Sequence, residues 1–154
     1  MNVEYINPFI EASQQVFQMM IGIKPRLGKV HLKTSPYEGD SIAVIVGLTG
    51  KMRGQVIITL SNETARSVAS IMMGGMPVEV LDEIANSAIS ELGNMIMGNT
   101  ATILATKGIG IEITPPSLLS GEKIKISSAG MKTICVPLEL GENKRVHIDI
   151  SLEE

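Results

Sequence analysis

The segment Asp82–Gly108, DEIANSAISELGNMIMGNTATILATKG, carries the longest helical pattern in the chain. The pattern begins near Asp82 and ends at Lys107-Gly108, a cation followed by a glycine, which is a common helix terminus. At about 1.5 Å per residue this helix is roughly 39 Å long. We therefore expect it to be the central element of the fold.

The two faces of this helix differ in character when successive residues are placed about 100° apart. The predicted core face is apolar and consists of Ala85, Ile89, Leu92, Ile96 and Ile103. The opposite face is short-chained, without lysine or arginine, and consists of Glu83, Ser87, Glu91, Asn94, Gly98, Ala101 and Ala105. A solvated face usually mixes both charge signs, and asparagine or glycine inside a helix costs about 0.5–1 kcal/mol relative to alanine. We interpret the second face as a contact surface; an ordinary solvated face is the alternative.

Two shorter helices are predicted elsewhere. The first begins at Asn7-Pro8, a capping residue and a proline suited to the first turn, and ends before Lys24-Pro25. The second follows Ser61-Asn62 and stops at the Gly74-Gly75 pair.

Most of the remaining chain has strand-like patterns. The predicted strands are Lys29–Ser35, Ser41–Leu48, Gly54–Leu60, Ile109–Ile113, Lys123–Ser127, Lys132–Leu138 and Arg145–Leu152. We expect the first three to form a meander. The last strand is expected to keep one solvated face, made of Arg145, His147, Asp149 and Ser151. The order of elements predicts an α+β fold with a mostly antiparallel sheet.

An internal repeat supports two pseudo-symmetric halves. At an offset of eighty residues the matches are Glu11 with Glu91, Gln14 with Asn94, Pro36 with Pro116, and Gly50 with Gly130. Chance is the alternative explanation for so few matches, but the order of helix and then strands also recurs.

Length and composition restrict the class of protein. The 154 residues fit a single domain, 1–154. With 13 basic and 16 acidic residues, the net charge of −3 argues against nucleic acid or an anionic membrane surface as a partner. The first twenty residues contain no lysine or arginine, so no secretory signal is expected, and no apolar run approaches a membrane span. We expect a cytoplasmic protein.

Several kinds of catalytic site are disfavoured. Cys135, His31 and His147 are isolated, so a zinc site is not expected, and Cys135 lies in a strand-like run typical of a buried, inert thiol. The two histidines alternate with apolar neighbours, as solvent-facing strand residues do. The lack of clustered histidine and aspartate argues against a metal-dependent hydrolase of small phosphoesters. Any catalysis must use carboxylates, amides and hydroxyls.

The pattern Ser87-x-x-x-Glu91-x-x-Asn94, followed by Pro116, resembles the consensus of the CheC/CheX family of chemotaxis phosphatases. The resemblance extends over essentially the whole chain. It includes NPFIE at its start, a glycine-rich hairpin GLTGKMRG at residues 47–54, and MMGGMP at residues 72–77. The family spacing places the proline at the position of Ser117, one residue beyond Pro116.

This resemblance implies a CheC-like fold and a substrate, the receiver protein CheY carrying an aspartyl phosphate. It implies that Asn94 orients the attacking water and that Glu91 docks the receiver, with Ser87, Gly98 and Pro116 as accessory candidates. The Mg²⁺ would be held by the receiver, with no cofactor bound by this chain. The resemblance also implies a homodimer.

The first half of the repeat carries Glu11 and Gln14 where family members with two motifs have glutamate and asparagine. Glutamine is one methylene longer and would misplace its amide by about an ångström or more. We therefore expect one working site per chain. The alternative function is a non-catalytic, flagellar-switch-like domain that binds CheY, although the intact Ser87, Glu91 and Asn94 set favours an enzyme.

Overall fold

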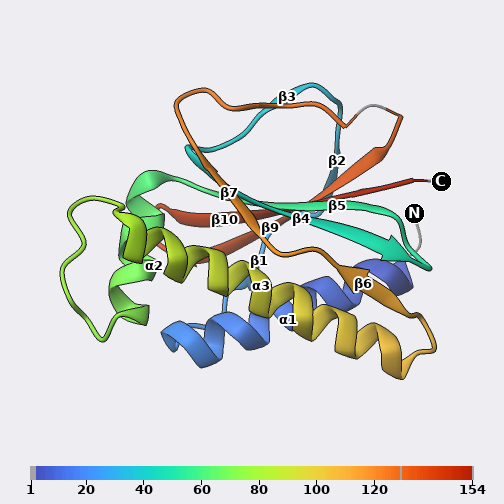
Figure 1. Ribbon diagram of the computed structural model, residues 1–154, viewed down its shortest axis with the longest axis horizontal. Coiled ribbons are helices and arrows are strands. Elements are labelled where there is room, and N and C mark those ends of the chain that lie inside the picture. Colours follow the sequence, from blue (N-terminus) through green and yellow to red (C-terminus); the bar gives the residue numbers. More distant parts are fainter. Residues whose placement is uncertain (1–2, 129, 154) are drawn as a thin grey trace.

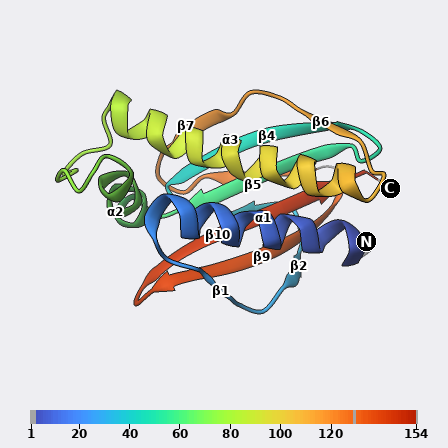
Figure 2. The ribbon, with the colours of Figure 1, turned by 90° about the horizontal axis from the view of Figure 1, so that it is seen from below.

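The computed structural model describes residues 3–128 and 130–153. Within them, helices pack on one face of an eight-stranded antiparallel sheet, and a two-stranded ribbon covers part of the other face (Figures 1 and 2). The helices are α1 (Val3–Ile21), α2 (Asn62–Met72) and α3 (Glu83–Thr106). The strands are β1 (Arg26–Leu27), β2 (His31–Lys33), β3 (Tyr37–Glu38), β4 (Ile42–Gly50), β5 (Gly54–Leu60), β6 (Ile111–Ile113), β7 (Ser117–Ser120), β8 (Lys125–Ile126), β9 (Lys132–Gly141) and β10 (Lys144–Leu152).

The two halves of the chain repeat one plan: a long helix, two short strands, a ribbon strand and a hairpin. The short strands are exchanged between the halves. β1 and β2 pair with β9, whereas β6 and β7 pair with β4. β5 pairs with β10 at the centre, and β3 pairs with β8 in the ribbon. This arrangement confirms the predicted α+β fold with two pseudo-symmetric halves and a long helix, α3.

The predicted meander of the first three strands is wrong. The hairpin of β4 and β5 forms as expected, but β2 pairs with β9 across the sheet. Local alternation of apolar and polar residues identifies a strand but not the strand with which it pairs. Here the partner is determined by the exchange of short strands between the two halves. The short strands β1, β3 and β7 were not predicted. Two residues, as in β1 and β3, are too few to show a period, and the sequence SLLS of β7 does not alternate.

The repeat offset of eighty residues holds for the helices and fails for the strands. The buried residues of α1 and α3 coincide at that offset, as in Phe9 with Ile89 and Val16 with Ile96. Gly50, however, ends β4 at a positive φ of 100°, and its counterpart is Gly141, which ends β9 at a φ of 148°. Pro36 precedes β3 and Pro116 precedes β7, so these prolines are not equivalent either.

Helix α1 begins at Val3, earlier than predicted, so that Pro8 lies inside the helix and not in its first turn. Proline removes a backbone donor and usually marks a first turn. Here the preceding turn is retained since Ile6 and Phe9 are both buried in the core. Packing therefore overrides the local signal.

Helix α3 lies against the sheet through the predicted apolar face. Ala85, Ile89, Leu92 and Ile96 are buried as expected, but Ile103 is only half-buried and Leu104 takes the core position. Gly93, which the sequence pattern did not single out, allows a close approach of α3 to β4. A Cβ on Gly93 would lie 2.8 Å from Val44 Cγ1 of β4. The absence of a side chain at Gly93 thus fixes the depth of the helix on the sheet.

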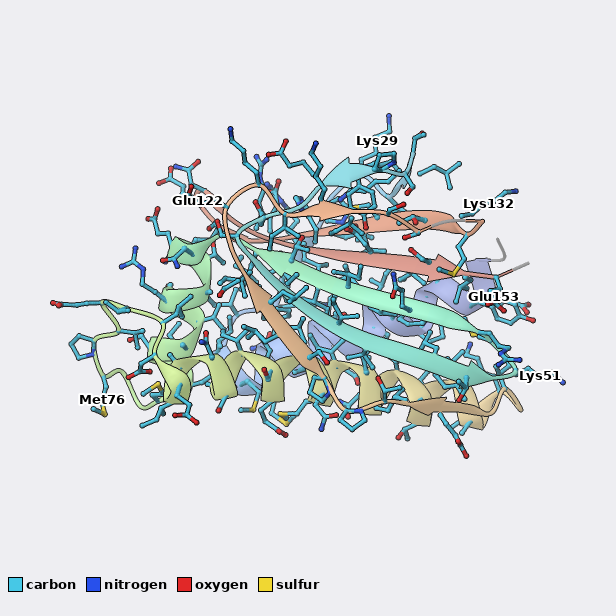
Figure 3. All side chains as sticks on the ribbon, turned by 45° about the horizontal axis from the view of Figure 1, so that its top comes forward. Lys29, Lys51, Met76, Glu122, Lys132 and Glu153 are labelled. Carbon is cyan, nitrogen blue, oxygen red and sulfur yellow. The ribbon has the colours of Figure 1, made fainter. Side chains whose placement is uncertain are left out.

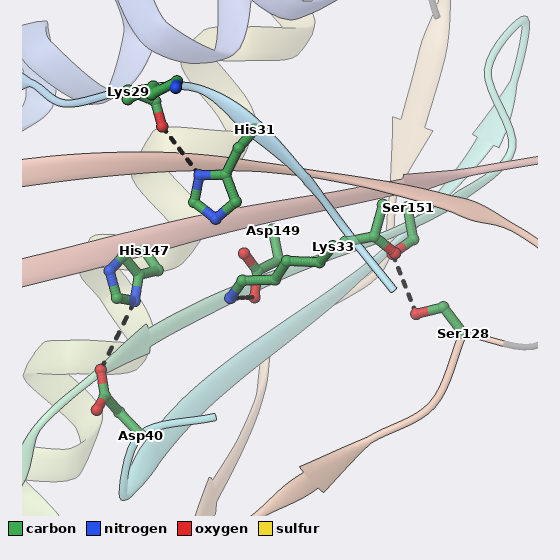
Figure 4. A network of polar contacts seen from close by, with 9 residues as sticks. Lys29, His31, Lys33, Asp40, Ser128, His147, Asp149 and Ser151 are labelled. Atoms are coloured by element: carbon green, nitrogen blue, oxygen red, sulfur yellow. Dashed lines mark hydrogen bonds and ion pairs between the residues drawn. The ribbon is translucent and has the colours of Figure 1, made fainter. Parts of the chain in front are cut away.

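The predicted solvated face of the last strand is wrong for Asp149 and Ser151, which are buried. Lys33 from β2 reaches over this face, and its Nζ lies 3.1 Å from Asp149 Oδ2 (Figure 4). Ser151 Oγ lies 3.1 Å from Ser128 Oγ (Figure 4). Alternation alone would predict a solvent-exposed face. Residues distant in the sequence, from β2, the ribbon and the segment after it, bury this face instead.

Cys135 lies under the same cover and is fully buried, as predicted. Burial, with a smaller contribution from the Asp149 carboxylate, raises the pKa of the Cys135 thiol to about 12. The thiolate is therefore scarce at neutral pH, which agrees with an inert thiol. His31 is exposed as expected, whereas His147 is half-buried, with its Nδ1 3.9 Å from Asp40 Oδ2 (Figure 4).

Candidate functional site

An open groove of about 540 Å³ runs along the outer face of α3. Its lining residues are polar or small: Glu83, Asn86, Ser87, Ser90, Glu91, Asn94 and Pro116. All but Pro116 come from the first three turns of α3. The predicted site residues Ser87, Glu91, Asn94 and Pro116 are thus brought together in one place.

The six helical residues form two adjacent rows. Asn86, Ser90 and Asn94 follow one another at four-residue spacing, which places them along one side of the helix. The neighbouring row at the same spacing contains Glu83, Ser87 and Glu91. Ser87 and Glu91 are exposed and Asn94 is half-buried, so all three predicted side chains face away from the core.

Gly98, the remaining accessory candidate, lies one turn beyond Asn94 and is not among the lining residues. A Cβ at this position would meet no atom within 4 Å. The surface next to Asn94 is therefore open on the side of Gly98.

The connection between β6 and β7 supplies the wall that faces Asn94. Thr114 N donates to Gly47 O at 3.0 Å, and Gly47 N donates to Thr114 Oγ1 at 2.8 Å. A Cβ on Gly47 would lie 3.0 Å from Thr114 Cγ2, so the glycine permits this close contact. Pro116 then leaves the ladder, because proline has no N–H to donate. The family spacing would place the proline at residue 117, but that residue is Ser117, which belongs to β7 and pairs with Ile45. The proline that lines the groove is Pro116.

Both walls of the groove are positioned by contacts with the same strand, β4. Val44 sets the height of α3 through Gly93, and Gly47 holds the Thr114 turn that presents Pro116. At its first turn α3 is capped by Asp82, whose Oδ1 accepts from Ala85 N at 2.9 Å. A rigid strand and a capped helix therefore position the two sides of the groove.

Sequence reasoning missed Asn86, Ser90 and Gly93. The four-residue spacing that joins Asn86 and Ser90 to Asn94 was visible in the sequence and could have identified the first two. Gly93 could have been suspected as a glycine within the apolar face of a long helix. Pro116 was identified, but its place beside Asn94 depends on the pairing of β6 and β7 with β4.

The functional groups of the groove are not used internally. Within residues 3–128 and 130–153, no hydrogen bond or ion pair engages the Asn94 carboxamide or the Glu91 carboxylate. In the same described residues Asn86 Oδ1 is buried without a hydrogen-bond partner. The charged residues of α3 are Glu83 and Glu91, so the groove is acidic and offers amide and hydroxyl groups to an external partner.

Neither a metal site nor a membrane helix is found in the part of the chain that the structure describes. No group of three or more histidine, cysteine, aspartate or glutamate side chains is arranged there to hold a metal ion. None of the described helices combines the length and the apolar character needed to cross a membrane.

A smaller depression of about 250 Å³ lies on α1, the pseudo-symmetric counterpart of α3. Its lining residues are Glu11, Gln14, Gln15, Gln18 and Lys24. The Gln14 amide is occupied, because its Nε2 donates to Pro25 O at 3.2 Å. The two halves thus carry related but unequal faces.

The exchanged α+β fold and the groove on its long helix define a CheC-like protein. The crystal structure of a CheC-like superfamily protein from Shewanella sp. PV-4 superposes with a TM-score of 0.90, covering 100% of both chains at 26% identity.

The chain belongs to the chemotaxis phosphatase CheX family, whose model matches residues 42–139. The CheY-P phosphatase CheX of Thermotoga maritima is 39% identical over 131 residues, which are 85% of this chain and 84% of the relative. The crystal structure of a CheX–CheY–BeF₃–Mg²⁺ complex from Borrelia burgdorferi matches with a TM-score of 0.86 and 33% identity, covering 99% of this chain and 100% of that chain. These matches confirm the family resemblance.

Proposed function

We propose that this protein hydrolyses the aspartyl phosphate of phosphorylated CheY. The observation that carries the proposal is the Asn94 carboxamide, which lies half-buried in an open groove with no hydrogen-bond partner among the described residues. The similarity to the CheY-P phosphatase of Thermotoga maritima and to the CheX–CheY complex supports the same substrate.

An acyl phosphate is intrinsically labile, so the catalyst mainly has to orient water in line with phosphorus. A carboxamide suits this task because its oxygen accepts a hydrogen bond while its nitrogen donates one. The Asn94 oxygen would accept from the water, whose oxygen forms the new bond to phosphorus. The bond from phosphorus to the receiver aspartate breaks, which yields inorganic phosphate and a free carboxylate. Mg²⁺ would be held by the receiver's own carboxylates.

Glu91 would dock the receiver. It is exposed, three residues from Asn94, and without an internal ion-pair partner in the described chain. A carboxylate there can form a charge-assisted hydrogen bond to a basic side chain of the receiver, which would set the register of docking. Ser87, four residues earlier, can add a hydroxyl to the same contact. Pro116 would limit the movement of the bound phosphoryl group, and Gly98 would leave room for the receiver backbone.

A cytoplasmic location and a homodimer belong to this proposal, as does a single domain over residues 1–154. The location follows from the substrate class. The short outer strands of the sheet, β1 and β2 on one edge and β6 and β7 on the other, leave backbone groups that a second copy could pair with. Sedimentation at micromolar concentration tests the dimer, and a monomer throughout would contradict it.

Phosphate release from chemically phosphorylated CheY, with Mg²⁺ present, tests the function. Removal of a transition-state amide typically costs about 10² to 10³ in rate, so Asn94→Ala should lose activity by that factor. Asn99→Ala is the matched control, because Asn99 is a half-buried asparagine of the same helix outside the groove. Full activity of Asn94→Ala would reject the assigned role.

The alternative function predicts a different result. A flagellar-switch-like domain would bind activated CheY without accelerating phosphate release, and Asn94→Ala would then change neither quantity. Turnover of a generic chromogenic phosphoester would instead indicate a small-molecule hydrolase.

A further inference from the structure

Three strongly exposed apolar side chains lie at the end of the groove where α3 begins. Met76, Val80 and Ile84 are 61%, 74% and 66% exposed, respectively. We call these three residues the apolar rim. Met76 and Val80 belong to the connection between α2 and α3, and Figure 3 shows Met76 at the end of the molecule beside the start of α3. Ile84 follows Glu83, the first lining residue of the groove.

The rim is held in a defined conformation. Within the connection, Val78 and Leu81 are half-buried and pack against the main core. Ser70 Oγ donates to Met76 O at 2.7 Å, which ties the connection back to α2. Because the connection already has its own inward-facing anchors, Met76 and Val80 are not needed to attach it. Their exposure needs another explanation.

Ile84 lies on the same face of α3 as the predicted docking residue. Ser87 and Glu91 follow it by three and seven residues, a spacing that keeps all three on one side of a helix. A β-branched residue is also a poorer choice than alanine or glutamate for an exposed helical position. An apolar side chain next to polar groove residues can add to the affinity of an interface when the partner desolvates it.

We propose that the apolar rim binds an apolar patch on phosphorylated CheY and extends the docking surface beyond Glu91. This inference rests on the proposed function. A standard interface covers about 800 Å² of each partner, a patch of roughly 16 Å radius. Ile84 lies about 15 Å from Asn94 along the helix axis, at about 1.5 Å per residue. A receiver whose contact area is centred on Asn94 therefore reaches Ile84 at its margin, on the side where the apolar rim begins.

The test compares Ile84→Ala with wild type in two measurements. One is the Kd for CheY activated by BeF₃ and Mg²⁺, and the other is the KM and kcat of phosphate release. We expect Kd and KM to rise about five- to tenfold with kcat unchanged, since truncation of an interface anchor weakens binding without touching Asn94. Val80→Ala should have a smaller effect in the same direction. Met19→Ala is the matched control, because Met19 is 63% exposed on α1, outside the groove and outside the outer strands of the sheet.

Each other outcome has a distinct meaning. Unchanged Kd and KM in Ile84→Ala, with an active wild type, would overturn the rim and leave the proposed function standing. A loss of kcat at constant Kd would also overturn it, as would a dimer that Ile84→Ala converts to a monomer, because the rim would then bind a second copy. A wild type that neither binds activated CheY nor releases phosphate would reject the proposed function itself.

Discussion

Helices α1 and α3 occupy equivalent places in the two halves, but the amide three residues after the glutamate is bonded within the chain on α1 and not on α3. Each helix exposes a glutamate, Glu11 or Glu91, and carries an amide side chain three residues later, Gln14 or Asn94. Their buried positions also coincide at the same offset. The scaffold therefore offers two similar faces for one kind of chemistry.

The faces differ in what surrounds the amide. Gln14 donates to the Pro25 carbonyl, whereas no described residue bonds the Asn94 carboxamide. The α1 depression is about 250 Å³ and is bordered by Lys24, while the α3 groove is about 540 Å³ and is bordered by Pro116. The bonded amide of Gln14 and the unbonded amide of Asn94 therefore differ in two respects: one methylene of side-chain length, and the loop that adjoins each helix.

The largest expected effect comes from giving α3 the residue of α1. In Asn94→Gln the amide extends one methylene further into the groove, and a misplacement of about 1 Å can cost 10²-fold in rate. We expect kcat for phosphate release from CheY to fall about 10²-fold, while the melting temperature stays unchanged. If Asn94→Gln kept wild-type kcat, side-chain length would not explain the difference between the helices.

Gly93 provides a second comparison, since its counterpart in α1 is Ser13. In Gly93→Ala the new Cβ would meet Val44 Cγ1 at 2.8 Å, and overpacking of this kind typically costs about 1–3 kcal/mol. Urea unfolding should show this loss. Gly98→Ala is the matched control: its Cβ meets no atom within 4 Å, so a gain of about 0.5–1 kcal/mol is expected from helix propensity. Equal stability of the two variants would refute the close-packing role of Gly93.

Charge reversal at the two equivalent glutamates, Glu91 and Glu11, tests whether they differ in docking the receiver. Glu91→Lys should raise the KM for phosphorylated CheY about tenfold, because it replaces the proposed docking charge by a like charge. Glu11→Lys, the equivalent change on α1, should leave KM unaltered. The comparison fails if both variants shift KM equally, which would indicate a general effect of net charge.

The smallest expected effect is the repair of α1. Adding Gln14→Asn to the Asn94→Ala variant restores the motif of glutamate and asparagine on α1, but the face keeps Lys24 and its smaller depression of about 250 Å³. We expect phosphate release to stay at the level of Asn94→Ala alone. Recovery of activity would show that the identity of the amide suffices and that the wall is dispensable.

The elements that follow local rules were predictable, and those set by distant contacts were not. The pattern of α3 and the hairpin of β4 and β5 are visible in the sequence because each depends on neighbouring residues. The pairing of β2 with β9 and the burial of Asp149 depend on the exchange of strands between halves, which no local period encodes.

The same division applies to the groove. Glu91 and Asn94 share a helix, so their common face follows from helical geometry alone. Pro116 lines the groove with Asn94 because β6 and β7 both pair with β4, and the chain leaves the ladder between them at Pro115 and Pro116, directly after Thr114. The spacing of the proline in the sequence could not supply that proximity, whereas the four-residue spacing of Asn86 and Ser90 with Asn94 could have identified these two lining residues.

The exchange of short strands has a consequence for synthesis on the ribosome. β1 and β2, made early, have their pairing partner in β9 at residues 132–141. The first half therefore cannot complete its share of the sheet until β9 has been synthesised. Contacts of such long sequence separation form slowly. The nascent chain would thus carry the unpaired segments of β1 and β2 until β9 has emerged from the ribosome.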